Sequence, residues 1–144
     1  MQKNVLVRVS SLQIPDNGAP GDTFEVMVPG VYFYRNGKHY LHYEETMEGF
    51  SKPVQNLIRM DQEEMDVKKT GLIFSHMHFA QGEKMVSPYK TPLGIIQMAF
   101  HTKAYVLESD EDHLLARASY GLSMEDAHVA DCTIMIEAVE QQDQ

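Results

Sequence analysis

Residues 31–45 read VYFYRNGKHYLHYEE, and this stretch decides the fold class. At its centre, Asn36-Gly37 separates two runs that are rich in aromatic residues. An Asn-Gly pair suits a tight turn that needs positive φ at both central residues, and aromatic residues favour strands. The stretch therefore predicts a β-hairpin, in which alternate side chains point to opposite faces of a sheet.

Short alternating stretches of aromatic and β-branched residues continue on both sides of the hairpin, from Val5 almost to Val139. Turn-forming residues separate these stretches along the whole chain. Such strands bury their apolar face only in a closed or double-layered sheet. We therefore expect an all-β fold, a closed or nearly closed antiparallel barrel of about eight to ten strands. The first strand should pair near the last one.

Residues 51–65 allow two interpretations. Ser51 could cap a helix that Pro53 opens, because apolar residues follow at helical spacing. Apolar and polar residues also alternate over residues 54–60, which is typical of a strand. We favour two strands joined by a turn at residues 61–63.

Pro29-Gly30 falls within the expected second strand, in which Phe24, Val26 and Val28 share one face. Proline removes a backbone donor, and glycine often marks a bend or a close approach of two backbones. The pair predicts that the strand is interrupted there by a bulge or corner, of the kind that curves the sheet of a barrel.

The length and charge of the chain restrict the function. Its 144 residues suffice for one domain, spanning residues 1–144, of which only residues 140–144 look like a polar tail. The net charge is −9, and the basic residues are scattered. Because such a surface repels phosphate backbones, we expect no nucleic-acid partner.

Cys132 is the only cysteine, which excludes an internal disulfide and a multi-cysteine zinc site. It lies among alternating apolar residues, where a buried thiol is inert. Near the start of the chain, Lys3 and Arg8 flank a segment too short and too alternating for a signal peptide or a membrane span. We therefore expect a cytoplasmic protein without a membrane partner.

Four segments are characteristic when taken together: YLHYEE at 40–45, QGEK at 81–84, YKTPLG at 89–94 and MAFHTK at 98–103. They resemble the YwiB-like family of uncharacterised bacterial proteins, whose fold is a calycin-like (lipocalin-like) β-barrel. The resemblance implies that fold for nearly the whole chain and an interior able to hold a small ligand. It implies no established activity or catalytic residues, and the cofactor remains unknown.

The candidate ligand-binding residues are aromatic, with one carboxylate. A tyrosine offers a large apolar surface and a hydroxyl that can orient a ligand, whereas a carboxylate inside a barrel needs a cationic partner. We expect the ligand to contact Tyr43, Glu45, Tyr89, Phe100 and Tyr120. The candidate cationic partners are Arg8, Arg59 and Arg117. The alternative is that the aromatic side chains fill the core and that Glu45 lies at the rim in water.

His76 and His78 form the sharpest chemical motif. Residues two apart on a strand share a face, so both imidazoles could bind one metal ion. Glu83 follows at a position similar to that of a ligand in the metal-binding motif of cupins, another all-β family. The alternative is that Met77 and Phe79 take the inner face and that both histidines face solvent. Two histidines without a third ligand bind a metal ion only weakly. The cupin motif also has a later histidine, for which His101 is a candidate only if its strand lies alongside.

Three functions follow from these observations. The favoured one is non-catalytic binding of a small, partly apolar molecule inside the barrel. The second is a cupin-like metal-dependent enzyme that uses His76 and His78. The third is a protein-interaction module, with a homodimer formed through an exposed strand edge or an apolar patch. No local motif pairs a nucleophile with its base, so the sequence favours a protein that is not an enzyme without deciding the question.

Overall fold

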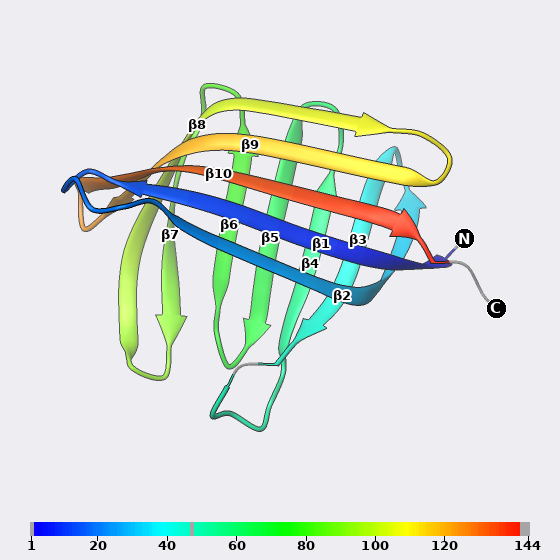
Figure 1. Cartoon of the computed structure of the whole chain (residues 1–144), viewed down its shortest axis with the longest axis horizontal. Helices are drawn as coiled ribbons and strands as arrows, with labels where there is room; N and C mark the ends of the chain where they lie inside the picture. The colour runs from blue at the N-terminus through cyan, green and yellow to red at the C-terminus, as the bar shows by residue number, and fades with distance from the viewer. Residues whose placement is uncertain (1, 47, 142–144) are drawn as a thin grey trace.

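The computed structural model describes residues 2–46 and 48–141, and these form ten β-strands (Figure 1). In chain order, the strands are β1 (Gln2–Pro15), β2 (Asp22–Arg35), β3 (Lys38–Glu45), β4 (Val54–Met60), β5 (Glu64–Gly71), β6 (Ser75–Ala80), β7 (Lys84–Thr91), β8 (Gly94–Ser109), β9 (His113–Met124) and β10 (Ala127–Glu140). Among the described residues, no helix is long and apolar enough to cross a membrane.

The strands form one antiparallel sheet in the order β6-β5-β4-β3-β2-β1-β10-β9-β8-β7. Residues 5–15 of β1 pair with residues 130–140 of β10, which confirms the expected neighbourhood of the first and last strands. The polar tail expected at 140–144 begins later than predicted, because Glu140 ends β10 and the Gln141 N–H donates to the carbonyl of Asn4 over 2.9 Å. Residues 142–144 lie outside the described residues.

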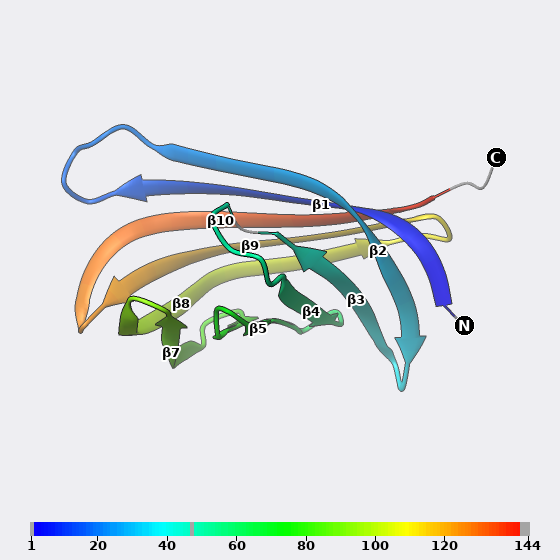
Figure 2. The same ribbon diagram turned by 90° about the horizontal axis from the view of Figure 1, so that it is seen from below.

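The sheet folds over into two layers. In Figure 1, β9, β10 and β1 cross in front of β3–β6 rather than running along them. The long strands β2 and β8 belong to both layers: β2 pairs with β1 over residues 22–33 and with β3 over residues 31–35. Similarly, β8 pairs with β7 over residues 94–101 and with β9 over residues 98–109. Figure 2 shows β2 curving from one layer to the other, which confirms the expected nearly closed barrel.

Residues 31–33 of β2 pair with both β1 and β3 and so form its corner between the layers, and Pro29-Gly30 lies directly before them. The strand is not interrupted, however, because its pairing with β1 continues through both residues without a shift of register. A Cβ atom added to Gly30 would lie 2.9 Å from the carbonyl oxygen of His42 and 2.9 Å from a methyl group of Val7. Glycine therefore lets β3 and β1 approach this point closely, and the continuous register with β1 shows that the predicted bulge is absent here.

Two turn predictions are confirmed. Asn36 and Gly37 have φ angles of 53° and 78°, and they connect β2 to β3 as the hairpin prediction requires. Residues 61–63 join β4 to β5, so the helical alternative for residues 51–65 is wrong. Strand alternation prevails because residues 54, 56, 58 and 60 each present a buried side chain to the interior.

The barrel closes incompletely between β6 and β7, at what we call the seam. At one end of the seam, Phe74 and Lys90 exchange two backbone hydrogen bonds of 2.9 and 2.8 Å. At the other, the Gly82 N–H donates to the Thr102 carbonyl over 2.9 Å, and the Thr102 N–H donates to the Glu83 carbonyl over 3.0 Å. Within the described residues, no ladder joins β6 to β7 between these points.

The core fills much of the space between the layers. Val5, Val7 and Val9 of β1 are buried, as predicted, and so are Cys132 and its alternate neighbours on β10. Phe79, Phe100 and Tyr120 pack against one another with ring centroids 4.8 to 6.2 Å apart. Beyond this aromatic cluster, the interior is not filled.

Candidate ligand-binding site

A cavity of about 260 Å³ lies between the two layers. Apolar side chains form most of its lining, among them Met77, Met98, Phe100, Tyr120, Ile134 and Ile136. Its lining includes Phe24, which is 52 % exposed, so the cavity opens to solvent beside β2. An apolar cavity of about 150 Å³ can hold benzene. This one therefore has room for an organic molecule of about one ring with a short chain.

One wall of the cavity is polar because four strands align their polar residues. Tyr43 of β3 lies directly opposite Asn56 of β4, Asn56 lies opposite Lys69 of β5, and Lys69 lies opposite Ser75 of β6. We call these four residues the polar row. The next inward-facing row consists of Leu41, Ile58, Val67 and Met77 and is apolar. The change from one row to the next gives the interior a polar side and an apolar side.

Lys69 is the charged member of the polar row, and it has two partners. Its Nζ donates to Oε1 of Glu45 over 2.9 Å and to Oδ1 of Asn56 over 2.7 Å. The side-chain amide of Asn56, a residue with 0 % exposure, also donates to Glu45 Oε1 over 3.3 Å. A lysine ammonium has three protons to donate, so these contacts leave one for a ligand.

Three hydroxyls near Lys69 are free for a ligand. Within residues 2–46 and 48–141, no group hydrogen-bonds the hydroxyl of Tyr43, Ser75 or Tyr89, although Tyr43 and Ser75 are each only 5 % exposed. Burial raises the pKa of Tyr43 and Tyr89, and the nearby charge of Glu45 raises both further. These phenols therefore stay protonated at neutral pH and act as hydrogen-bond donors.

The cavity brings together most of the residues singled out from the sequence. Tyr43, Tyr89, Phe100 and Tyr120 all contribute to its lining. Glu45 does not line the cavity, but it holds Lys69, which does. Whether these residues bind a ligand remains a prediction.

Sequence reasoning missed Lys69. The predicted partners of Glu45 lie elsewhere: Arg8 pairs with Glu137, Arg59 pairs with Asp66, and Arg117 contacts the sulfur of Met135. Lys69 directly follows Lys68, and composition alone does not distinguish the two lysines. The alternation of Met65, Val67 and Lys69 along β5 is the signal that could have placed its side chain inside.

His76 and His78 lie on the outer face of β6, while Met77 and Phe79 face inward. One oxygen of Asp66 lies 2.8 Å from His76 Nε2 and 2.9 Å from His78 Nδ1. The other oxygen of Asp66 accepts a hydrogen bond of 2.8 Å from Arg59. The two imidazoles therefore share a carboxylate at hydrogen-bond distance.

The electrostatics of this outer cluster are coupled. Burial by itself would raise the pKa of Asp66 and lower the pKa of His78. The contacts of both residues have a larger effect, so the two pKa values shift in the opposite directions. Hydrogen bonds from Arg59, His76 and His78 lower the pKa of Asp66. The hydrogen bond with Asp66 and the charges of Asp66, Glu64 and Glu83 raise the pKa of His78. The arrangement suits an ionic network.

His101, the further candidate metal ligand, lies on β8. In the sheet, β8 is not a hydrogen-bonded neighbour of β6, the strand that carries His76 and His78.

A comparison with known families identifies the relatives of this barrel. Residues 7–136 match the model of a domain of unknown function, DUF1934. The chain belongs to the DUF1934 family. This confirms the resemblance noted in the sequence, because the DUF1934 chain is also 27 % identical over 128 residues to the uncharacterized β-barrel protein YwiB of Bacillus subtilis (strain 168). That match covers 86 % of this chain and 87 % of YwiB.

A solved structure supports the fold of the DUF1934 chain. The crystal structure of the ywiB protein from Bacillus subtilis superposes with a TM-score of 0.80, covering 98 % of this chain and 94 % of that one. The identity over the superposed residues is 20 %, so this likeness shows the fold alone. The relatives are themselves uncharacterised, and the function of the DUF1934 chain has to come from its own geometry.

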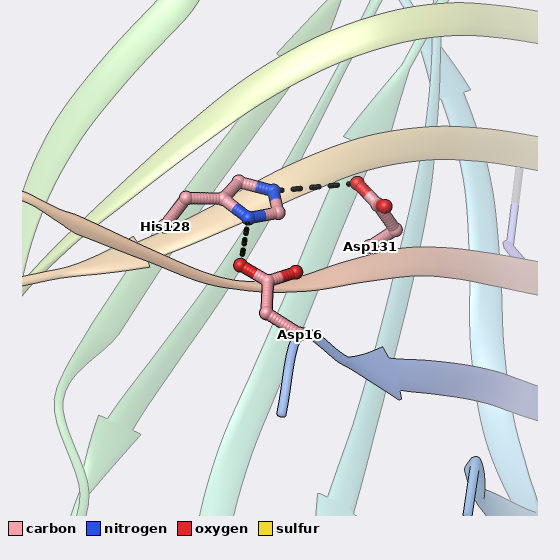
Figure 3. Close-up of side chains that lie close together, drawn as sticks. All are labelled: Asp16, His128 and Asp131. Atoms are coloured by element: carbon pink, nitrogen blue, oxygen red, sulfur yellow. Dashed lines mark hydrogen bonds and ion pairs between the residues drawn. The ribbon is translucent and has the colours of Figure 1, made fainter. Parts of the chain in front are cut away.

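A second polar cluster of the DUF1934 chain lies on the surface (Figure 3). His128 Nδ1 lies 2.5 Å from Oδ2 of Asp16, and His128 Nε2 lies 3.3 Å from Oδ1 of Asp131. In the described part of the chain, these three exposed residues form the group of potential metal ligands whose atoms lie within 4.8 Å of one another. Lys103 also lies 3.0 Å from the same oxygen of Asp131.

This surface cluster joins the turn after β1 to β10. The hydrogen bond with Asp16 and the charges of Asp16 and Asp131 raise the pKa of His128. The two carboxylates face opposite nitrogens of the ring, as Figure 3 shows, whereas a metal ion would bind only one of those nitrogens. The arrangement therefore suits a protonated imidazole between two carboxylates.

Proposed function

We propose that the protein binds a small, partly apolar molecule inside a calycin-like barrel and does not catalyse a reaction. The observation that carries the proposal is the cavity of about 260 Å³ with apolar walls and one polar row. Ligand sites typically combine a mostly apolar lining with a few polar groups that fix orientation. Tyr43, Tyr89, Phe100 and Tyr120 contact the ligand in this proposal, and Glu45 acts through Lys69.

The protonation states of the lining support binding over catalysis. A general acid or base works best with a pKa near the operating pH. The phenols of Tyr43, Tyr89 and Tyr120 have pKa values raised mainly by burial, which moves them further from neutrality. The ammonium of Lys69 is held by Glu45 and Asn56. These groups are suited to donating hydrogen bonds to a bound molecule.

The test uses a pair of variants on the same strand. Ser11→Phe places a ring in the cavity, because Ser11 lines it, whereas Leu12→Phe enlarges a side chain on the opposite face of β1. 4-(Dimethylamino)benzonitrile, a neutral one-ring dye whose fluorescence changes in apolar sites, serves as the probe. We expect saturable fluorescence with the wild type and Leu12→Phe, and loss of the signal with Ser11→Phe.

Native mass spectrometry of gently purified protein, compared with its denatured mass, complements the dye. An added organic mass that is absent from Ser11→Phe supports the proposal. A bare polypeptide mass together with dye binding that Ser11→Phe leaves unchanged contradicts it.

We also propose that this binding takes place in the cytoplasm of a bacterium. Cys132 is a free and buried thiol, which fits a reducing compartment, and the related protein YwiB comes from a bacterium. The net charge of −9 speaks against a nucleic-acid partner. Cell fractionation with an antibody against the native protein tests the location, and recovery with the membrane fraction contradicts it.

Self-association is a second candidate, favoured by exposed apolar side chains on the β7–β8 hairpin. Val86 is 62 % exposed, Leu93 is 99 % exposed and Ile95 is 62 % exposed. Such a patch can form an interface between copies. Light scattering over a concentration series should show a dimer that Ile95→Ser weakens, and a constant monomer mass contradicts this candidate.

A further inference from the structure

The charge of the cavity lining indicates which chemical class of ligand it accepts. Among residues 2–46 and 48–141, Lys69 is the only charged residue in that lining, and no acidic side chain contributes to it. Glu45, whose carboxylate balances Lys69, lies outside the lining and has a side chain that is 24 % exposed. A molecule that enters the cavity therefore meets the ammonium of Lys69 in the lining, whereas the carboxylate that balances it, 2.9 Å away, is not part of the lining.

The polar groups that face the cavity beside Lys69 favour an acceptor. The third ammonium proton of Lys69 and the unpartnered hydroxyls of Tyr43, Ser75 and Tyr89 can all donate. A carboxylate accepts several hydrogen bonds at once, and charge-assisted hydrogen bonds are stronger than neutral ones. An alcohol offers a single oxygen, and an amine would place a second cation beside Lys69.

The remainder of the cavity has to be filled by an apolar body. Met77, Met98 and Phe100 line it opposite or beside the polar row, and methionine side chains adapt to irregular shapes. The volume of about 260 Å³ excludes a long acyl chain and suits one ring or a short branched chain.

We propose that the ligand is a small monocarboxylic acid with an apolar body, bound with its carboxylate at Lys69, Tyr43 and Ser75 and its body between the methionines and Phe100. This inference rests on the proposed binding function and adds the class of ligand. Glu45 and Asn56 are positioning residues, because they hold the ammonium of Lys69 at the polar row without contacting the ligand.

The experiment compares three probes that share one skeleton and differ in the polar group: phenylbutyrate, phenylbutanol and phenylbutylamine. Calorimetric titration at neutral pH measures the affinity of the wild type for each. A charged hydrogen bond contributes about 1.5–3 kcal/mol, so we expect the acid to bind roughly tenfold or more tightly than the alcohol. The amine should bind most weakly.

Three variants locate the residues that cause the preference for the acid. Lys69→Met removes the ammonium, and we expect it to bind the acid no better than the alcohol. Lys68→Met, which removes the exposed neighbouring lysine on the opposite face of β5, should keep the wild-type preference. Tyr43→Phe removes a hydroxyl that has no protein partner, so the fold should persist while the affinity for the acid falls. This variant keeps the test decisive if Lys69→Met is unstable.

The outcomes separate this inference from the function on which it rests. If the alcohol binds as tightly as the acid, and Ser11→Phe abolishes both, the cavity binds ligands but the acid class is wrong. The class is also wrong if the preference for the acid persists in both Lys69→Met and Tyr43→Phe. If none of the probes binds and the dye does not bind either, the binding function itself is contradicted.

Discussion

Tyr43 on β3 and Lys69 on β5 lie in one row across the sheet, separated by the fully buried side chain of Asn56. Asn56 accepts from Lys69 over 2.7 Å and donates to Glu45 over 3.3 Å. A buried polar group that loses its partners costs about 1–3 kcal/mol. The stability of the polar row should therefore depend on Asn56.

The first prediction concerns that dependence. Asn56→Ala should lower the free energy of unfolding by about 2 kcal/mol, because Lys69 loses an acceptor and a small void forms at the fully buried position 56. Gln55→Ala is the matched control, since the neighbouring Gln55 only donates to Glu44 on the exposed face. It should change the free energy by less than about 0.5 kcal/mol. Urea denaturation measures both, and equal effects would falsify the structural role of Asn56.

The second prediction concerns pH. Because the pKa of His78 is raised in the folded protein, its contribution is fully present below the unfolded value of about 6.5 and is lost as pH rises through the folded pKa. The wild type should lose up to about 1 kcal/mol of this contribution between mildly acidic and mildly alkaline pH. His78→Gln should remove that part of the dependence in urea titrations at several pH values. The same slope in both proteins would contradict the network around Asp66.

The third prediction concerns metal binding by His76 and His78. Both imidazoles lie within hydrogen-bond distance of the same oxygen of Asp66, so a zinc ion would have to displace that contact. We expect less than stoichiometric zinc after dialysis, measured by elemental mass spectrometry. Stoichiometric zinc that disappears in His76→Ala would establish the metal-dependent alternative instead.

The fourth prediction concerns the corner of β2. Gly30→Ala should destabilise the protein by about 1–3 kcal/mol, because the new Cβ would lie 2.9 Å from the carbonyl oxygen of His42 and the backbone has to shift. Gly21→Ala is the control, since its Cβ would approach no atom closer than 3.4 Å. Thermal unfolding compares the two variants. A neutral Gly30→Ala would show that the corner tolerates a side chain.

Local chemistry explains what the sequence could predict. The Asn36-Gly37 turn and the alternating valines of β1 specify their own conformation and face, so the hairpin and the inner face of the first strand could be predicted. The pairing of β1 with β10 was expected from the barrel itself, in which the first and last strands are neighbours, and it lies in the middle of the sheet.

The site depends on relations that no single segment contains. Lys69 enters the polar row only because three hairpins bring Tyr43, Asn56 and Ser75 into register with it. The corner at Gly30 depends on how closely β3 passes, and the volume of the cavity is what remains after all side chains have packed. These features follow from tertiary packing, which the pattern of one strand does not encode.

The pairing of β1 with β10 also has a consequence for biosynthesis. The central contact of the sheet joins the strand that leaves the ribosome first to the strand that leaves last among the ten. Local hairpins such as β2–β3 can form during translation, but β1 keeps an open edge until β10 is available. Nascent chains therefore pass through a stage in which an apolar strand is exposed to chaperones or to neighbouring chains, and the barrel can close only after all ten strands have been made.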